Sequence, residues 1–471
     1  MEPRTLQFIA SACGGELRAG APGRRVTGLT TDSRKVGAGE LFFALPGDRF
    51  DGHDFVPTVA AAGAGAVVVA RSWTGSVGDH DCGVVVVDDT RRALGRLAAA
   101  YRAQFAARRI AVGGSNGKTT TKELLAAVLA ERLATLASEA SFNNDIGVPL
   151  TLLRLTANHA VAVLEAGTNH PGELALLVAL IAPEFGVITS IGREHLEHFG
   201  DVAGVAEEEG ALAAGLPAEG RLFLNGDDPW SAALAARSAA PVIRVGCGPA
   251  NDWRAEQIRL DEQGAEFSVR GPRAELAGQY RVNLLGRHQV GNALLALAVA
   301  AELGLTAAEI RRGLAACRPA RMRLQTWDWN GVRVLDDAYN ANADSMLAAL
   351  ATLRDLPCAG RRVAVLGDMA ELGGQAPAAH AEVGRGAVAA GVDRLFAVGR
   401  MAGVLGSAAR AEGLAAVSEY AAPAAAAAEL RSYLRPGDVL LLKASRSTRL
   451  ERLGEALRAP AEGESAHVLL S

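Results

Sequence analysis

The chain has 471 residues, of which 49% are hydrophobic and 21% are charged, and its formal net charge is −4. The length predicts two to four domains of an ordinary globular protein, and the charge offers no basic field that would attract a nucleic acid. The sequence has no apolar run of membrane-spanning length and no cysteine pair of C-x-x-C spacing, so we expect a cytoplasmic protein with reduced thiols and no membrane insertion.

Short strand-like runs alternate with turns over the first hundred residues. LFFALPGDRFDGHDF (41–55) is expected to be a strand followed by a loop rich in Gly and Asp. The valine-rich runs AGAVVVAR (64–71) and CGVVVVDD (82–89) are typical of buried strands. A helix is predicted over residues 91–105, and it leads into the next strand.

The octapeptide GGSNGKTT at 113–120 lies between an apolar run that ends at Val112 and an amphipathic run that begins at Lys122. Strand, glycine loop and helix form the setting in which backbone N–H groups bind phosphate. Lys118 is predicted to reach the terminal phosphates of a nucleoside triphosphate, and the Thr119 hydroxyl to bind Mg²⁺. The remaining phosphate-binding positions are predicted to be Gly114, Ser115, Asn116, Gly117 and Thr120. The strict P-loop pattern has Gly where this chain has Val112, so a glycine turn with an incidental lysine is the alternative.

From about residue 108 to 318 the pattern predicts a doubly wound α/β domain. The expected strands are RRIAV, HAVAVLEAG, FGVITSIG, GRLFLNGDD and PVIRVG, followed by a β-rich patch at 252–271 and a helix at 286–304. Glu165 ends one strand, where a carboxylate would either bind Mg²⁺ or cap a helix. His195 and His198 have helical spacing, and they are read as a zinc pair, as one magnesium-site histidine, or as a surface pair.

After Pro319 a third α/β unit is predicted, because four strand-like runs end in polar clusters. Ligands of open α/β sheets bind beyond the carboxyl ends of the strands, so these clusters are expected to share a site. The alanine-rich run at 423–429 is expected to be a helix. The clusters contain Asp337, Tyr339 and Asn340 in DDAYNAN, the segment GDMAELG at 367–373, and Lys443, Ser445 and Arg446 in KASRS.

Read together, these motifs resemble the Mur ligases, ATP-dependent enzymes that form amide bonds in peptidoglycan synthesis. The resemblance covers nearly the whole chain. DDAYNAN and GDMAELG are typical of the member that adds D-alanyl-D-alanine, while the DNPR motif of the diaminopimelate-adding relative is absent. The motifs that carry the resemblance are TDSRKVGAGELFFALPGDRFDGHDF, GSNGKTTTKE, FNNDIGVPLTLLRL, EAGTNHPGE, HLEHFG, GRHQVGNALLALA, DDAYNANADSM, GDMAELG and KASRS.

The resemblance implies three domains and a reaction. A small N-terminal α/β domain (1–98) would bind the UDP-sugar end of the substrate. A central doubly wound P-loop domain (99–318) would bind ATP and Mg²⁺, and a C-terminal Rossmann-like α/β domain (319–471) would bind the incoming dipeptide. The γ-phosphate of ATP would activate the carboxylate of UDP-N-acetylmuramoyl-tripeptide, and the amine of D-alanyl-D-alanine would attack the acyl phosphate. Positioning and charge stabilisation would do most of this work. We expect a monomer.

The resemblance also assigns roles to single residues. Glu165 and His195 match residues of the metal site, and Asp337 matches a residue beside the nucleotide and the reacting groups. Contacts to ATP are implied for Lys118, Thr119, Asn292, Arg321, Tyr339 and Asn340. Ser33 and Arg34 match the uridine-diphosphate end of the substrate site. By their charge, Lys443 and Arg446 are expected to receive a carboxylate, and Ser445 is expected at the same substrate site.

Glu209 is the position at which this chain departs from the family. The Mur ligases that this chain resembles usually have a lysine at this position. CO₂ converts that lysine to a carbamate, which holds a second Mg²⁺. Glutamate has the same type of charge on a shorter arm, so we hypothesise that Glu209 replaces the carbamate and removes any need for CO₂. The alternative is a solvated helix residue, because runs of charge such as 207–209 usually face water.

Two other functions remain open on these motifs. One is another ligase of the superfamily, such as a folylpolyglutamate synthase, against which DDAYNAN and GDMAELG argue. The other is a P-loop ATPase that serves as a switch or binding module and hydrolyses ATP without an acceptor amine. The third residue of the tripeptide, lysine or diaminopimelate, is not determined by the sequence.

Overall fold

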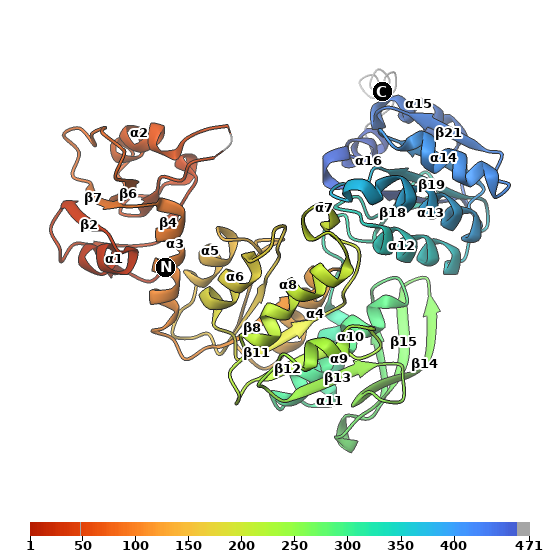
Figure 1. The fold of residues 1–471 in the computed structure, drawn as a ribbon, viewed down its shortest axis with the longest axis horizontal. Helices are drawn as coiled ribbons and strands as arrows, with labels where there is room; N and C mark the ends of the chain where they lie inside the picture. Colours follow the sequence, from red (N-terminus) through yellow and green to blue (C-terminus); the bar gives the residue numbers. More distant parts are fainter. Residues whose placement is uncertain (48, 459–471) are drawn as a thin grey trace, which may run out of the picture.

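The β-branched runs of the sequence form three large sheets that follow one another along the chain (Figure 1). The computed structural model describes residues 1–47 and 49–458. We call the three sheets with their helices the N-terminal unit, the central unit and the C-terminal unit. In Figure 1 the N-terminal unit is red to orange and the C-terminal unit is blue, and the central unit connects them. The predicted α/β class is confirmed.

The N-terminal unit is built on a five-stranded sheet in which only β2 runs antiparallel to its neighbour. The valine-rich runs form its buried middle strands, as expected. In spatial order the strands are β2 (Glu16–Ala19), β7 (Gly83–Val87), β6 (Ala66–Ala70), β5 (Leu41–Phe43) and β4 (Leu29–Thr30). The other elements are a ladder of β1 (Arg4–Thr5) with β3 (Arg25–Val26), the helices α1 (Leu6–Cys13) and α2 (Val56–Ala61), and the 3-10 helices η1 (Ser33–Lys35) and η2 (Gly52–Phe55).

Helix α3 (Thr90–Arg102) joins the N-terminal unit to the central unit. Asp89 caps it by accepting a hydrogen bond from the Arg92 amide, and its apolar face packs against α1, α5 and α6. The helix predicted over residues 91–105 is therefore present. The predicted boundary between residues 98 and 99 lies within α3, and the boundary between 318 and 319 follows α11; both boundaries stay predictions.

The central unit contains a nine-stranded sheet in which the P-loop strand β8 lies between β11 and β10. Its strands are parallel except for the β14–β15–β16 meander, and the predicted β-rich patch at 252–271 forms β14 and β15 of it. In spatial order they are β16 (Gly278–Val282), β15 (Gly264–Arg270), β14 (Trp253–Asp261), β13 (Val242–Gly246), β12 (Arg221–Asn225), β11 (Phe185–Ile188), β8 (Arg108–Gly113), β10 (Val161–Glu165) and β9 (Thr135–Ala137).

Helices cover both faces of the central sheet. The alanine- and leucine-rich α10 is buried along most of its length, because it packs between strands β12 to β16 and helices α4 and α11. Helices α6 and α8 pack together on the opposite side. The helices are α4 (Lys118–Ala130), α5 (Gly147–Leu152), α6 (Glu173–Ile181), α7 (Leu196–Phe199), α8 (Val202–Ala214), α9 (Ser231–Ala235), α10 (His288–Glu302), α11 (Ala307–Ala316) and the 3-10 helix η3 (Ala274–Leu276).

The C-terminal unit is a six-stranded sheet, parallel except for the edge strand β17. All four predicted strands are present, and the edge strands β17 and β21 were not predicted. In spatial order the strands are β17 (Gln325–Trp329), β18 (Val332–Asp336), β22 (Val439–Lys443), β19 (Arg362–Gly367), β20 (Arg394–Val398) and β21 (Val417–Tyr420). The helices are α12 (Ala343–Asp355), α13 (Ala376–Ala389), α14 (Ala402–Ala411), α15 (Pro423–Tyr433), α16 (Glu451–Arg458), and the 3-10 helices η4 (Gly373–Gln375) and η5 (Arg446–Thr448).

This strand order explains why three distant motifs meet. Strands β18, β22 and β19 are parallel neighbours, so DDAYNAN, KASRS and GDMAELG all leave the same edge of the sheet. The alanine-rich run at 423–429 lies in α15, as expected. Across the described residues, no helix is both long enough and apolar enough to span a membrane.

Candidate active site

The glycine loop between β8 and α4 requires two of its glycines for steric reasons. Gly114 has φ +107° and Gly117, the N-cap of α4, has φ +89°, both in the left-handed region that favours glycine. A Cβ on Gly114 would lie 2.5 Å from the Thr189 hydroxyl, and one on Gly117 would lie 2.7 Å from the Asn292 side-chain oxygen. The loop thus holds a conformation in which backbone N–H groups can face an anion.

Lys118 points back over this loop. Its ammonium group donates to the carbonyl oxygens of Gly114 and Ser115 and lies 3.2 Å from a carboxylate oxygen of Glu194. Burial alone would lower the pKa of Lys118, but the carboxylates of Glu194, Glu209 and Glu165 raise it above its usual value. Lys118 is therefore a positively charged side chain, fixed by its contacts, at the position where the phosphates of a nucleoside triphosphate would bind.

Two oxygen atoms beside Lys118 are buried without a hydrogen-bond partner. They are the Thr119 hydroxyl and Oε2 of Glu165, while Oε1 of Glu165 accepts a 2.8 Å bond from Asn143. Mg²⁺ prefers such oxygen ligands and usually completes its shell with phosphate oxygens and water. Within the described ranges, no group of three or more His, Cys, Asp and Glu side chains is placed to hold a metal. The residues fit a magnesium ion shared with a nucleotide and argue against the zinc reading of His195 and His198.

His195 lies on the rim of the same site, directly before α7. Its backbone is left-handed, with φ 49° and ψ 32°. Nδ1 lies 2.5 Å from Oε2 of Glu371, but the two atoms are not aligned as a hydrogen bond. The His195 side chain holds the pKa of Glu371 below its usual range, although partial burial opposes this effect.

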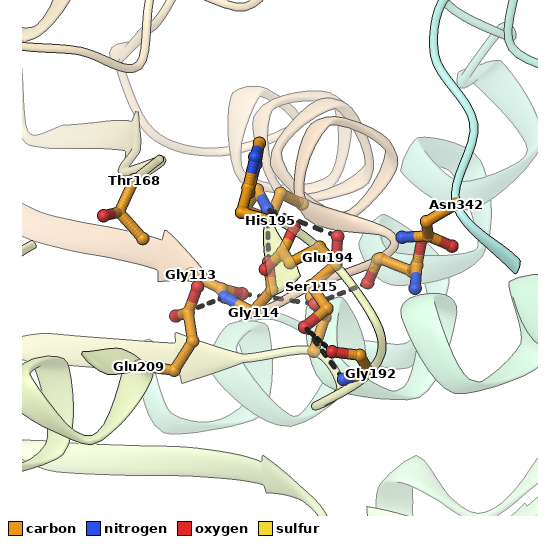
Figure 2. A network of polar contacts seen from close by, with 12 residues as sticks. Gly113, Gly114, Ser115, Thr168, Gly192, Glu194, His195, Glu209 and Asn342 are labelled. Atoms are coloured by element: carbon orange, nitrogen blue, oxygen red, sulfur yellow. Dashed lines mark hydrogen bonds and ion pairs between the residues drawn. The ribbon is translucent and has the colours of Figure 1, made fainter. Parts of the chain in front are cut away.

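Glu209 reaches the loop from α8, and Figure 2 shows it approaching Gly114 from below the strand. Its side chain is 0% exposed, Oε2 accepts a 2.7 Å bond from the Gly114 amide, and Oε1 has no partner. Burial raises the pKa of Glu209 to about 8, although Lys118 acts in the opposite direction. The interpretation of Glu209 as a solvated helix residue is therefore wrong, because the side chain is packed beneath the phosphate loop.

One cavity of ≈1410 Å³ lies between the central unit, the C-terminal unit and the linking helix α3. Its walls include α3, the glycine loop and α6 of the central unit, and the strand-end loops of the C-terminal unit. Asn342, at the start of α12, donates a 3.0 Å bond to Asn116 of the glycine loop, and Figure 2 shows Asn342 on the side of the loop opposite Glu209. Predicted residues on the cavity wall are Ser115, Asn116, Gly117, Lys118, Thr119, Thr120, Glu165, His195, Asn292, Asp337, Tyr339, Asn340 and Lys443.

The C-terminal part of the cavity is organised by one buried ion pair. Nζ of Lys443 lies 2.5 Å from Asp337 and donates a 3.1 Å bond to the carbonyl of Asn340. Arg323 stacks over the ring of Tyr339 at 4.3 Å. The structure thus joins the ends of β18 and β22 and places an unpredicted arginine on the cavity wall.

Seven predicted residues are not on the cavity wall: Gly114, Glu209, Arg321, Ser33, Arg34, Ser445 and Arg446. Ser445 is buried and has a structural role. Its hydroxyl accepts from the Ala370 amide and donates to the Ala341 carbonyl, so it ties two strand-end loops together. Arg446 pairs with Glu451. Ser33 and Arg34 lie on η1 of the N-terminal unit, where the largely exposed Arg34 forks onto Asp32.

The structure does not support the predicted contact of Arg321 with ATP. Its side chain is 73% exposed and lies 3.7 Å from Glu455 of α16, outside the cavity. Arg323 is the arginine of this segment that faces the site. The left-handed backbone at Met322, with φ 56°, lies between the two and is consistent with their different directions.

Sequence reasoning missed four further polar residues of the site. Asn143 and Glu371 belong to motifs that were noticed, FNND and GDMAELG, but their partners were not foreseeable. Glu194 directly precedes His195, and this proximity was the only signal for it. The four missed residues are Asn143, Glu194, Arg323 and Glu371.

Known proteins match this chain over nearly its full length. The Mur ligase catalytic domain matches residues 25–102, the Mur ligase middle domain 112–300 and the Mur ligase glutamate ligase domain 320–446. A curated relative, UDP-N-acetylmuramoyl-tripeptide–D-alanyl-D-alanine ligase of Escherichia coli (strain K12), is 39% identical over 465 residues. That alignment covers 96% of this chain and 98% of the relative.

Two crystal structures are similar to the whole molecule. MurF from Acinetobacter baumannii superposes with a TM-score of 0.88 and 32% identity, and the match covers 97% of this chain and 99% of that one. MurF ligase from Thermotoga maritima in complex with ADP has a TM-score of 0.80 and 26% identity, with 91% and 96% covered. The similarity therefore extends over all three sheet units.

Proposed function

The chain belongs to the Mur ligase family, and from that premise we propose that it joins D-alanyl-D-alanine to UDP-N-acetylmuramoyl-tripeptide at the expense of ATP. The observation that carries this proposal is the single cavity in which the glycine loop faces the strand-end loops of the C-terminal unit. A ligase of this kind must bring a nucleotide, a carboxylate and an amine together, and this cavity offers a wall for each.

In the first step the γ-phosphoryl group moves from ATP to a carboxylate oxygen of the tripeptide, and ADP leaves. The N–H groups of the glycine loop and the ammonium group of Lys118 stabilise the charge on the transferred group. Lys118 exchanges its contacts with the Gly114 and Ser115 carbonyls for phosphate oxygens. Asn292 lies beside Gly117 and is proposed to contact the nucleotide.

Mg²⁺ is proposed to be held by the Thr119 hydroxyl and Glu165, with His195 nearby, and it would neutralise charge on the phosphates. The unpartnered oxygens of Thr119 and Glu165 support this assignment. Glu209 lies behind the loop, and its free Oε1 supports the hypothesis that it takes the place of a carbamylated lysine.

In the second step the dipeptide amine attacks the acyl carbon, inorganic phosphate leaves and the amine loses a proton. We propose that Lys443 and Arg323 bind the dipeptide carboxylate, because cations on a cavity wall favour that charge. Asp337 holds Lys443 in place by the ion pair. Arg446 is not proposed for this role, because it pairs with Glu451.

The remaining assignments are proposals as well. We propose that the N-terminal unit binds the UDP end of the substrate, with Ser33 and Arg34 as candidate contacts, and that the enzyme is a cytoplasmic monomer without a nucleic-acid partner. These proposals rest on the family and on the position of η1 in the N-terminal unit.

The decisive experiment measures ADP release with each substrate omitted in turn. We expect strict dependence on both the UDP-N-acetylmuramoyl-tripeptide and D-alanyl-D-alanine, tested with tripeptides that end in lysine or in diaminopimelate. ADP release without an acceptor would indicate a P-loop ATPase. Turnover with a folate and glutamate would indicate the folylpolyglutamate synthase alternative.

Lys118→Ala provides the first test of residue roles. Removal of the cation should abolish ADP release, because the loop would lose its charge for the γ-phosphate. Binding of the UDP-sugar substrate, measured by calorimetry, should persist, since its UDP end is proposed to bind to the N-terminal unit and not to the glycine loop. Retained turnover in a folded variant would contradict the role given to Lys118.

A further inference from the structure

Lys122 is a lysine whose side chain is completely buried. It lies on α4, one helical turn after Lys118, and it is 0% exposed. Its ammonium group donates bonds of 2.9 and 3.1 Å to the carbonyl oxygens of Ser138 and Ala140, and it also contacts the carboxylate of Glu123. Burying a charge is costly even when it is paired and hydrogen-bonded, and an apolar residue could fill the same space at a lower cost. The buried ammonium group therefore points to a role beyond packing.

The segment 138–143, which Lys122 holds, follows β9 and passes around the end of β10. The hydroxyl of Ser138 accepts a 3.2 Å bond from the backbone amide of Glu165. At the other end of the segment, Nδ2 of Asn143 donates a 2.8 Å bond to Oε1 of Glu165. Both ends of the segment therefore contact Glu165, one through its backbone and one through its side chain.

Close contacts fix the course of this segment. Ala140 has φ 45°, in the left-handed region that residues with a Cβ rarely adopt, and such a conformation persists where the surroundings hold it. The bond from Lys122 to the Ala140 carbonyl is one of the contacts that hold it. The Asn143 carbonyl accepts a 2.9 Å bond from the Gly167 amide, and a Cβ on Gly167 would lie 2.6 Å from Nδ2 of Asn143.

Lys122 thus connects the two elements that carry the candidate Mg²⁺ ligands. Thr119 lies on α4, three residues before Lys122, and Glu165 ends β10. The bond from Asn143 occupies Oε1 of Glu165, while Oε2 has no hydrogen-bond partner among the described residues. Because the segment 138–143 is bonded to α4 at one end and to Glu165 at the other, its position sets how the two ligands lie relative to each other.

We propose that Lys122 is a positioning residue for Mg²⁺. By holding the segment 138–143 against α4, it places Asn143, and Asn143 in turn orients the Glu165 carboxylate so that Oε2 is kept for the ion. Partners that orient a metal ligand commonly change metal affinity by about 10–100-fold when they are removed. The inference rests on the proposed function and deepens its Mg²⁺ step.

The test compares Lys122→Met with Leu129→Ala in the full-length protein. Methionine keeps most of the length of the side chain and removes the ammonium group. Leu129 is the matched control, because it is a buried residue of the same helix and has no polar group that could hold the segment. Calorimetry measures ATP affinity with Mg²⁺ and with EDTA, and electron paramagnetic resonance measures the binding of Mn²⁺ to the ATP complex. Neither measurement needs turnover.

In Lys122→Met, ATP affinity in EDTA should change little, while the affinity gained with Mg²⁺ and the Mn²⁺ affinity should each fall about tenfold or more. Part of kcat should return at high Mg²⁺. Leu129→Ala should lower the melting temperature and keep the Mg²⁺-dependent gain. Asn143→Ala should reproduce the loss, and the double variant with Lys122→Met should lose no more than either single variant, because both changes act through the same contact to Glu165.

An equal loss of ATP affinity in Mg²⁺ and in EDTA would overturn the inference, since it would indicate general damage to the nucleotide site. Additive losses in the double variant would also overturn it. Lys122→Gln, a shorter neutral donor, is the second variant in case Lys122→Met does not fold. If neither folds while Leu129→Ala does, Lys122 supports the fold as a whole and the inference fails. A wild type that binds Mg²⁺ and ATP but releases no ADP would count against the ligase function alone.

Discussion

Among single residues, Glu209 departs most clearly from what its family position leads one to expect. A carboxylate that is 0% exposed and bonded to the Gly114 amide is built into the phosphate loop. The neighbouring Glu208 is also buried, but it has a different role, because it accepts the amides of Gly172 and Leu174 at the start of α6. Two adjacent glutamates thus accept hydrogen bonds from two different backbone segments, the glycine loop and the start of α6.

Burial raises the pKa of Glu209, and Mg²⁺ bound beside it would lower that pKa again, so we expect Glu209 to supply its charge in the loaded site without CO₂. Turnover of the wild type should not respond to added bicarbonate or to its removal, and Glu209→Gln should lower kcat by about tenfold or more, since the amide keeps the shape but not the charge. Glu209→Ala should do the same. ADP release measures each of these effects.

The control for this prediction is Glu208→Gln, which removes the adjacent carboxylate from the first turn of α6 and should keep most of kcat. Bicarbonate stimulation of the wild type, or full activity in Glu209→Gln, would mean that Glu209 is not the replacement for a carbamate.

At the scale of single elements, the function depends on short turns at strand ends. The glycine loop joins β8 to α4, and Thr189, which follows the neighbouring strand β11, leaves no room for a side chain at Gly114. In the C-terminal unit, the GDMAELG turn is held by His380 of α13, which accepts from the Met369 amide through Nε2 while Nδ1 lies 2.7 Å from the Ala376 carbonyl. Each turn is therefore supported from a different element.

Gly114→Ala should abolish ATP binding and lower the melting temperature. A Cβ there would meet the Thr189 side chain and backbone within 3 Å at a positive φ, so the loop must shift. Gly172→Ala is the matched control: φ is +88°, but nothing lies within 4 Å of the added carbon. It should cost about 1–2 kcal/mol of strain and leave ATP binding intact. Calorimetry and thermal unfolding measure both effects, and equal losses in the two variants would contradict the steric argument.

His380 should make stability depend on pH. Burial lowers its pKa below the usual 6.5, so the unfolded chain binds this proton more tightly than the native protein does. The free energy of unfolding should therefore fall as pH drops below about 6.5, and this contribution should be present in full above it. His288, which burial also shifts downward, adds a contribution of the same sign.

The measurement for His380 is the melting temperature between pH 7.5 and 5.5 in the wild type and in His380→Gln. The variant should be less stable at pH 7.5 and show a weaker pH dependence, because glutamine cannot take up the proton. Parallel pH curves for the two proteins would exclude His380 as a source of the dependence.

At the scale of the whole molecule, a few polar contacts hold the C-terminal unit against the central unit. Arg193 makes the densest contact, with Asp344 and Glu382, and the Gln375 side chain donates to the Gly200 carbonyl. Asn342 touches the glycine loop from the same side. These contacts join the two halves of the cavity.

Arg193→Ala should loosen this docking. Loss of a forked, partly buried guanidinium should cost about 1 kcal/mol or more at the interface. Small-angle scattering should show a larger radius of gyration, and kcat should fall, because the two reacting groups would meet less often. Arg410→Ala is the control, since Arg410 pairs with Glu419 inside the C-terminal unit. An unchanged radius of gyration in Arg193→Ala would contradict the role of Arg193 in holding the two units together.

The sequence alone determined the fold class and the phosphate loop, because both depend on short-range patterns. Valine-rich runs become buried strands wherever they occur, and a glycine loop between a strand and a helix adopts its shape from neighbouring residues. Lys118, Thr119 and Glu165 were predicted in this way, and the structure places all three on the wall of one cavity. The motifs at the ends of β18, β19 and β22 were correctly expected to meet, because parallel strands present their carboxyl ends at one edge.

Only the tertiary structure decided which side chains face one another across the units. Arg323 replaced Arg321 on the cavity wall because the chain direction changes between them. Glu209 proved to be buried, and Glu371 proved to touch His195 although 176 positions separate them. Such contacts depend on how whole sheets dock, and docking is set by surfaces gathered from distant parts of the chain, which no local pattern encodes.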